Sequence, residues 1–453
     1  MVWEGRRREA SPYPDFYARS RGKLCACLRD FTIHCMSAEL LRFEEAHLRV
    51  QQAAAERARF QPPTEQAPLG EALGRVLAAP IVADEDQPPF ARSTRDGFAC
   101  RADEANRRAW LPIEGATHAG QQPGGPLPIG AAWEIMTGAP IPAGADAVAM
   151  VEHVERGGES VRLAEGRHLQ AGENIVPQGA QAHSGETLLR SGARLGPAQI
   201  ALAAACGCSA LAVYARPRVA ILTTGDELVP VDATPGPGQI RNSNAPMLAA
   251  LVAQAGGAPW VLPVAADAAE ALDAALQQAA VADMLLISGG VSAGKFDLVE
   301  PALARRDARF HFTGVKMQPG KPLVFGEMPS SKGDRSPLPF FGLPGNPVSS
   351  AATFLLFGAT MLAAVAGAEP YEPQFAMAQL AGDVSGKPGL TRFLPARWQP
   401  NAHGGEPPTV VPVPWQGSGD QAAFARANCF LVVPEEMPGL KAGVMARILI
   451  FQG

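Results

Sequence analysis

The sequence feature that most constrains the fold is an alternation of short apolar runs with helix-like segments between residues 216 and 368. Continuous apolar runs that alternate with helices are typical of a parallel sheet with helices on both faces. We therefore predict one α/β domain over this region. The apolar runs lie at 219–222, 260–264, 284–287 and 338–342, and the helical segments lie at 247–255, from about 267, and at 348–364.

The rest of the chain has different patterns of predicted secondary structure. Residues 98–192 consist of short strand-like segments between Gly and Pro turns, which predicts an all-β insertion. Before it, Ser37 could cap a helix that runs into Ala53–Ala55, and Leu69–Leu77 has the spacing of a second, short helix. After a linker at 369–373, alternating short strands predict a small β domain.

Composition excludes several function classes. The 453 residues carry a net charge of -5 and no basic patch with interleaved aromatic residues, so no nucleic-acid partner is expected. Seven cysteines without a C-x-x-C pair argue against a disulfide framework or a zinc site, as in a cytoplasmic protein. No apolar run reaches the roughly 20 residues that span a bilayer, so no membrane partner is expected.

The chemistry-bearing residues follow the predicted strands. Ligands of open α/β sheets bind beyond the carboxyl ends of the strands, where glycine turns and helix N-termini bring backbone N–H groups close to anions. Three strands end in 223–227, 288–297 and 342–350, and the acids Glu227, Asp267 and Asp297 lie just beyond such ends. Carboxylates beside a phosphate cradle indicate Mg²⁺.

A simpler interpretation is that these turns only close βα units, but three of them at the ends of strands in one sheet favour a site. Alone, Asp96-Gly97 and the turn 137–140 would each be read as ordinary turns.

Taken in order along the chain, these segments resemble the MoeA family, the molybdopterin molybdenumtransferases, which includes the E domain of gephyrin. The resemblance rests on the whole ordered set, since some segments also occur in related pterin-binding domains. The matching segments are Pro89-Phe90 with Ser93 and 96–99, 136–140, 144–148, 224–228, 288–292, 319–322 and 343–349.

The resemblance implies a multidomain α/β plus β fold and a homodimer. Residues 1–36 are expected to be a disordered extension. The implied domains are a discontinuous, elongated N-terminal domain at 37–91 and 169–215, a β insertion at 92–168, a MogA-like α/β molybdopterin-binding domain at 216–368, and a C-terminal β-barrel at 373–453.

The implied reaction inserts molybdate into adenylyl-molybdopterin and releases AMP, with Mg²⁺ as cofactor. Transient contacts with a molybdopterin adenylyltransferase and with recipient molybdoenzymes are also implied. By position, the catalytic residues are Asp96, Thr137, Glu227, Asp267 and Asp297, of which the last three would hold Mg²⁺. The pterin and adenylate would contact Thr224, Gly225, Asp226, Ser288, Gly289, Gly290, Ser292, Pro344, Gly345 and Asn346, and molybdate would contact Lys321, Ser349 and Ser418.

Three positions depart from the family pattern. Gln181 replaces a common acid, and Gln318 and Pro395 replace a Lys and an Arg. Two alternatives therefore stay open beside the molybdenum-inserting enzyme. One is a molybdopterin adenylyltransferase, which would need only the α/β domain. The other is a scaffold that binds the pterin without turnover.

Overall fold

The structure is a computed structural model that describes residues 40–290, 298–333, 336–369, 371–401 and 405–451. The expected extension at 1–36, the Ser37 cap, Ser292 and Asp297 lie outside these residues.

The α/β region contains one six-stranded sheet with three parallel and two antiparallel strand pairings. Its order is β16 (Ala258–Val261), β13 (Arg218–Thr223), β17 (Met284–Ser288), β21 (Leu338–Leu343), β20 (Val324–Met328) and β18 (Arg309–Phe312). The first four strands correspond to the four predicted apolar runs and are parallel to one another, as predicted. Two strands that were not predicted extend the sheet, with β20 antiparallel to β21 and β18 antiparallel to β20. The chain returns from β20 to β21 without a crossover helix, and a short return permits only antiparallel pairing.

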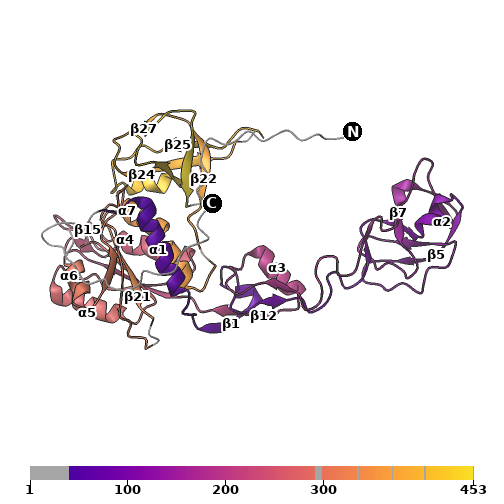
Figure 1. The fold of residues 1–453 in the computed structure, drawn as a ribbon, viewed down its shortest axis with the longest axis horizontal. Coiled ribbons are helices and arrows are strands. Elements are labelled where there is room, and N and C mark those ends of the chain that lie inside the picture. The colour runs from indigo at the N-terminus through magenta and orange to yellow at the C-terminus, as the bar shows by residue number, and fades with distance from the viewer. Residues whose placement is uncertain (1–39, 291–297, 334–335, 370, 402–404, 452–453) are drawn as a thin grey trace, which may run out of the picture. The chain divides into compact units, whose positions relative to one another are not determined.

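Helices cover both faces of this sheet (Figure 1). On one face, α4 (Asn244–Gln254) and the helix after β21 pack against Val219 and Ile221. On the other face, α5 (Ala269–Ala279) and α6 (Val299–Ala304) pack against Ala220 and Leu222. Successive strand residues point to opposite faces, so a run that is apolar at every position is buried on both sides.

The helix after β21 is almost entirely buried. It consists of α7 (Pro347–Thr353), a π-helical turn η3 (Phe354–Gly358) and α8 (Ala359–Val365). Its 19 residues have the length and apolarity of a membrane span, but 89% of its apolar window is buried inside the protein. That burial is expected of a core helix.

The first helix, α1 (Phe43–Arg57), packs against α8 and the π-helical turn. It begins later than predicted, because Leu41 instead forms a parallel bridge with Val315. The helix predicted at Leu69–Leu77 is reduced to one 3-10 turn, η1 (Leu69–Glu71). The N–H groups of Gly74 and Leu77 donate to the carbonyls of Leu195 and Ala193 instead, so tertiary pairing overrides the helical pattern here.

The segments on either side of the insertion pair with each other. Three antiparallel pairs join them: β1 (Thr64–Pro68) with β12 (Ala210–Tyr214), β2 (Ile81–Val82) with β11 (Thr187–Leu189), and β3 (Arg92–Ser93) with β10 (Ile175–Val176). One helix, α3 (Pro197–Ala205), precedes β12. Two segments that are distant in sequence therefore lie side by side here (Figure 1).

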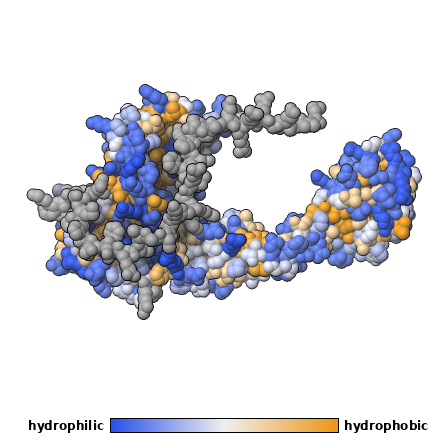
Figure 2. Space-filling view, viewed as in Figure 1, coloured by the Kyte–Doolittle hydropathy of each residue, from blue (hydrophilic) through white to orange (hydrophobic). Residues whose placement is uncertain are grey.

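The insertion itself is a six-stranded sheet. Its order is β7 (Ala147–Met150), β4 (Gly97–Cys100), β6 (Ala132–Ile135), β5 (Leu111–Thr117), β9 (Ser160–Leu163) and β8 (Val154–Gly157), with short helical segments α2 (Ala102–Asn106) and η2 (Val151–His153). Apolar residues at its surface lie among hydrophilic ones (Figure 2), and the largest exposed ones include Trp110, Ile129 and Val151. Single exposed apolar side chains are ordinary on a protein surface.

The C-terminal region forms the predicted β-barrel. Its five strands are β22 (Phe375–Leu380), β25 (Thr409–Pro412), β24 (Thr391–Gln399), β26 (Cys429–Val433) and β28 (Met445–Ile450), and the ring closes because β26 pairs with both β24 and β28. A short strand from the α/β region, β19 (Met317–Gln318), pairs with β24. Smaller elements are β23 (Val384–Ser385), β27 (Gly439–Leu440) and α9 (Gln421–Arg426).

Candidate functional site

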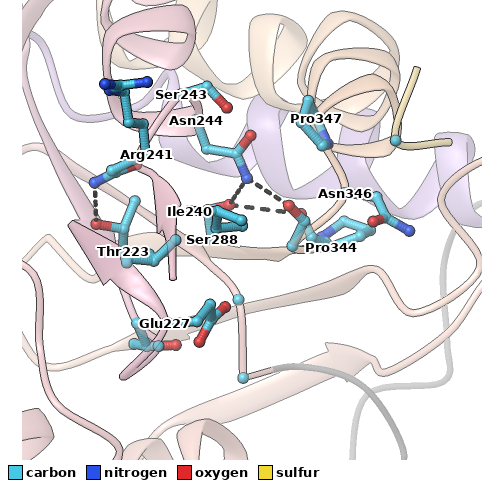
Figure 3. Close-up of a pocket in the computed structure, with 18 of the residues that line it drawn as sticks. Thr223, Glu227, Ile240, Arg241, Ser243, Asn244, Ser288, Pro344, Asn346 and Pro347 are labelled. Atoms are coloured by element: carbon cyan, nitrogen blue, oxygen red, sulfur yellow. Dashed lines mark hydrogen bonds between the residues drawn. The ribbon is translucent and has the colours of Figure 1, made fainter. Parts of the chain in front are cut away.

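A pocket of about 910 Å³ lies at the carboxyl ends of β13, β17 and β21 (Figure 3). Its position is the one expected for the ligand site of an open α/β sheet. The lining residues include polar groups from all three strand ends and from the segment that leads into α4. The chain also contributes Gly419 and Gln421 from the barrel region. The volume falls within the range of roughly 300–1,000 Å³ that is typical of small-molecule sites.

The turn after β17 requires glycine at two successive positions. Gly289 and Gly290 have φ values of +97° and +64°. A Cβ at Gly289 would lie 2.7 Å from the Thr224 carbonyl oxygen, so a side chain there would displace the neighbouring turn. The Thr224 hydroxyl is buried and has no hydrogen-bond partner among the residues that the structure describes. A buried, unpaired hydroxyl is costly, which indicates that a polar ligand group pairs with it.

Asn244 connects two of the strand ends. Its side-chain amide nitrogen donates to Ser288 Oγ at 2.8 Å and to the Gly345 carbonyl at 2.6 Å (Figure 3). The neighbouring Asn242 donates to Thr223 Oγ1 at 2.9 Å and accepts from the Ala245 N–H. The bridging role of Asn244 was not predicted from the sequence, although an Asn-rich segment beside two glycine turns could have suggested it.

Two of the predicted acids line the pocket, Glu227 and Asp267. Asp226 is oriented toward Asp267, because its Oδ1 accepts the Asp267 N–H at 3.1 Å. The third predicted acid, Asp297, lies outside the described residues. Among the residues that the structure describes, no three His, Cys, Asp or Glu side chains lie close enough together to hold a metal ion by themselves.

The barrel side of the pocket is joined to the turn after β21 by hydrogen bonds. Asn346 donates to Ser418 Oγ at 2.8 Å, and the Ser418 carbonyl accepts the Val348 N–H at 3.0 Å. Gln421 also donates to Ser243 Oγ. These bonds hold the predicted molybdate residue Ser418 beside the pocket.

None of the three predicted molybdate residues is among the described lining residues, although Ser418 precedes the lining residue Gly419. Ser349 is only 4% exposed, and its carbonyl accepts the Thr353 hydroxyl in α7. Lys321 is exposed next to Pro322, which does line the pocket.

Asp96 and Thr137 form a separate pair within the insertion. Asp96 Oδ1 accepts the Thr137 N–H at 2.7 Å and the Thr137 hydroxyl at 2.8 Å. These bonds lower the pKa of Asp96 below its ordinary value, the backbone bond having the larger effect. The carboxylate is therefore ionised at neutral pH. None of the described residues that line the pocket belongs to the insertion.

These features are those of a multidomain protein that binds a small-molecule ligand. Its α/β domain carries a polar pocket at the strand ends, and a β-barrel supplies part of the wall. Three family models match the chain in sequence: the MoeA N-terminal region (domain I and II) at 41–207, a probable molybdopterin binding domain at 220–364, and the MoeA C-terminal region (domain IV) at 377–451.

Curated relatives agree with these matches. The molybdopterin molybdenumtransferase of Bacillus subtilis is 34% identical over 86% of this chain and 90% of its own length. Molybdopterin molybdenumtransferase 2 of Mycobacterium tuberculosis is 34% identical over 84% of this chain and 93% of its own length. The crystal structure of the molybdopterin biosynthesis MoeA protein of Pyrococcus horikoshii OT3 is 29% identical, with a TM-score of 0.74, over 91% of this chain and 100% of that chain. The chain therefore belongs to the MoeA family of molybdopterin molybdenumtransferases, which are enzymes of molybdenum cofactor biosynthesis.

Proposed function

We propose that the pocket binds adenylyl-molybdopterin and that the protein uses molybdate to convert it to molybdenum cofactor with release of AMP. The main support for this proposal is that three strand ends surround one polar pocket. Its glycine turn after β17 and the unpaired Thr224 hydroxyl are suited to phosphate oxygens. The membership of the chain in the MoeA family supplies the substrate class.

In this proposal, the residues at the strand ends contact the pterin and the adenylate. The Gly290 backbone N–H and the Thr224 hydroxyl would donate to phosphate oxygens. Gly225 and Gly289, whose N–H groups already donate to the Ala265 and Leu343 carbonyls, would let the ligand approach the backbone closely. The bridge from Asn244 to Ser288 and Gly345 keeps two of these turns in one arrangement, so little reorganisation is needed on binding. The remaining proposed contacts are Asp226, Ser288, Ser292, Pro344, Gly345 and Asn346.

Mg²⁺ is the proposed cofactor, with Glu227, Asp267 and Asp297 as its ligands. The described residues fit such an ion, since Glu227 and Asp267 bring two carboxylates to a pocket suited to phosphate. Mg²⁺ commonly takes one or two carboxylates and completes its shell with water and phosphate oxygens. When bound, the ion would neutralise charge on the phosphate oxygens as the P–O bond breaks.

The molybdate part of the site is proposed at Lys321, Ser349 and Ser418, of which Ser418 has the best support because Asn346 holds its hydroxyl beside the pocket. Molybdate is a tetrahedral dianion, which a lysine and hydroxyl groups can bind. Two positions where the family has a positive side chain carry an uncharged residue in this chain. Gln318 is exposed in β19, and Pro395 is buried in β24.

Asp96 and Thr137 are proposed as further catalytic residues supplied by the insertion. The protein is also proposed to be a cytoplasmic homodimer that contacts a molybdopterin adenylyltransferase and recipient molybdoenzymes transiently. An adenylyltransferase activity is less well supported, because Gly419 and Gln421 of the barrel region line the same pocket and that activity would not need them.

The decisive experiment measures AMP released from adenylyl-molybdopterin with Mg²⁺, with and without molybdate. We expect molybdate-dependent release from the wild type. Glu227→Gln and Asp297→Asn should each slow it by roughly 100-fold, the scale of a lost electrostatic contact to developing charge. Glu165→Gln, an exposed acid of the insertion, is the matched control and should retain the wild-type rate.

Each adverse result has its own meaning. Binding of the pterin without any AMP release would replace the enzyme with the scaffold alternative. Wild-type rates in both Glu227→Gln and Asp297→Asn would show that the acidic residues are assigned to the wrong role.

A further inference from the structure

The charges around the pocket are unequally distributed. Glu227 and Asp267 line it, and Arg241 is the one Lys or Arg among the described lining residues. A ligand with phosphate groups is repelled by the two carboxylates and needs a compensating positive group. We propose that Arg241 binds the phosphate of the nucleotide half of the substrate and so distinguishes an adenylylated ligand from one without the nucleotide. This proposal rests on the proposed function.

Arg241 is held in register with Glu227 by a small parallel ribbon. The ribbon consists of β14 (Leu228–Val229) and β15 (Ile240–Arg241), in which Val229 lies opposite Arg241. The Ile240 N–H donates to the Glu227 carbonyl at 2.8 Å, and the Asn242 N–H donates to the Val229 carbonyl at 2.9 Å. The backbone therefore fixes the positions from which the side chains of Arg241 and Glu227 extend.

The side chain of Arg241 is tethered at one point only. Its Nε donates to the Ala233 carbonyl at 3.0 Å, which also ties the loop between β14 and β15 to the pocket wall. In the part of the chain that the structure describes, neither terminal guanidinium nitrogen has a hydrogen-bond partner. A guanidinium anchored through Nε keeps its terminal N–H groups free to bind an oxyanion, and phosphate accepts such a pair of bonds well.

The arrangement separates two kinds of phosphate contact. Figure 3 shows Arg241 and Glu227 at opposite ends of the labelled residues, with Thr223 between them. A pyrophosphate-linked ligand has more than one phosphoryl group, so one group can face the carboxylate end while another contacts Arg241. AMP, the product that carries the nucleotide phosphate, should then depend on Arg241 for binding even when no pterin is present.

The test measures binding of AMP and of adenosine, both with Mg²⁺, by calorimetry on the full chain. Adenosine lacks the phosphate and serves as the internal control. Arg241→Gln should weaken AMP binding by about 10- to 100-fold, the scale of a lost hydrogen bond to a charged group, and leave adenosine binding unchanged. Arg241→Lys should recover part of the loss, and Arg190→Gln, at an exposed arginine outside the pocket, should bind both as the wild type does.

Three results would overturn the assignment. AMP binding that is unchanged in Arg241→Gln would show that the guanidinium does not contact the phosphate. An equal loss for AMP and adenosine would show that Arg241 only shapes the pocket. A wild type that binds no AMP would exclude the contact. Molybdate-dependent AMP release from the wild type tests the proposed function separately, so its success beside any of these results would leave that function standing.

Discussion

At the scale of single residues, the pair Asp96–Thr137 shows how local hydrogen bonds set a charge. Two donors from Thr137 lower the pKa of Asp96, which is otherwise exposed to solvent. A folded-state pKa below the unfolded value means that the pair stabilises the fold above the unfolded pKa. That contribution is lost as the pH falls through the folded pKa. At neutral pH, Asp96 therefore remains a carboxylate.

We predict that Thr137→Val raises the pKa of Asp96 toward its ordinary value without reaching it. The variant loses the hydroxyl bond but keeps the backbone bond, which has the larger effect. A carboxyl-carbon NMR titration measures this change. Asp420, whose pKa is lowered mainly by the backbone N–H groups of Ala423 and Gln416, is the control and should not move. An unchanged Asp96 pKa would show that the hydroxyl does not contribute.

At the scale of elements, the sequence predicted the strands and helices whose burial can be recognised from the pattern of their apolar residues. The runs at β13, β17 and β21 are apolar at every position because helices cover both faces, and this is visible in sequence. The helix expected at Leu69–Leu77 failed because its backbone pairs with residues 193–195, more than a hundred positions away. The contacts of Asn244 were hidden for the same reason, since they join the ends of β17 and β21, which are distant from it in sequence.

The attachment of α1 also depends on long-range contacts. The Phe43 ring lies 5.6 Å from that of Phe357 in the π-helical turn and 5.1 Å from that of Phe393 in the barrel. We predict that Phe43→Ala lowers the free energy of unfolding by about 3–5 kcal/mol, because it removes a buried ring that joins three elements. Urea denaturation checks this value. Phe60→Ala, at a partly exposed ring beyond α1, should cost about 1 kcal/mol or less, and equal losses would refute the argument.

At the scale of the whole molecule, the candidate catalytic residues fall into two groups. Glu227 and Asp267 line the pocket of the α/β region, while Asp96 and Thr137 belong to the insertion, which contributes nothing to the pocket lining. The sequence could identify both groups through ordered motifs but could not say whether one chain unites them. On the proposed homodimer, the insertion of one subunit could complete the pocket of the other, since a twofold interface places each surface against its partner's.

This arrangement makes a quantitative prediction for mixed dimers. Asp96→Asn and Glu227→Gln should each be nearly inactive alone, since each lacks one group at every site. If the two chains are co-expressed and assemble at random, half of the dimers are mixed, and each mixed dimer has one site with both groups intact. Molybdate-dependent AMP release should then recover to about a quarter of the wild-type rate. Sedimentation must give a dimer of the 47.4 kDa chain in all samples. If dimers form but the mixed sample stays as inactive as the single variants, each active site draws both groups from one chain.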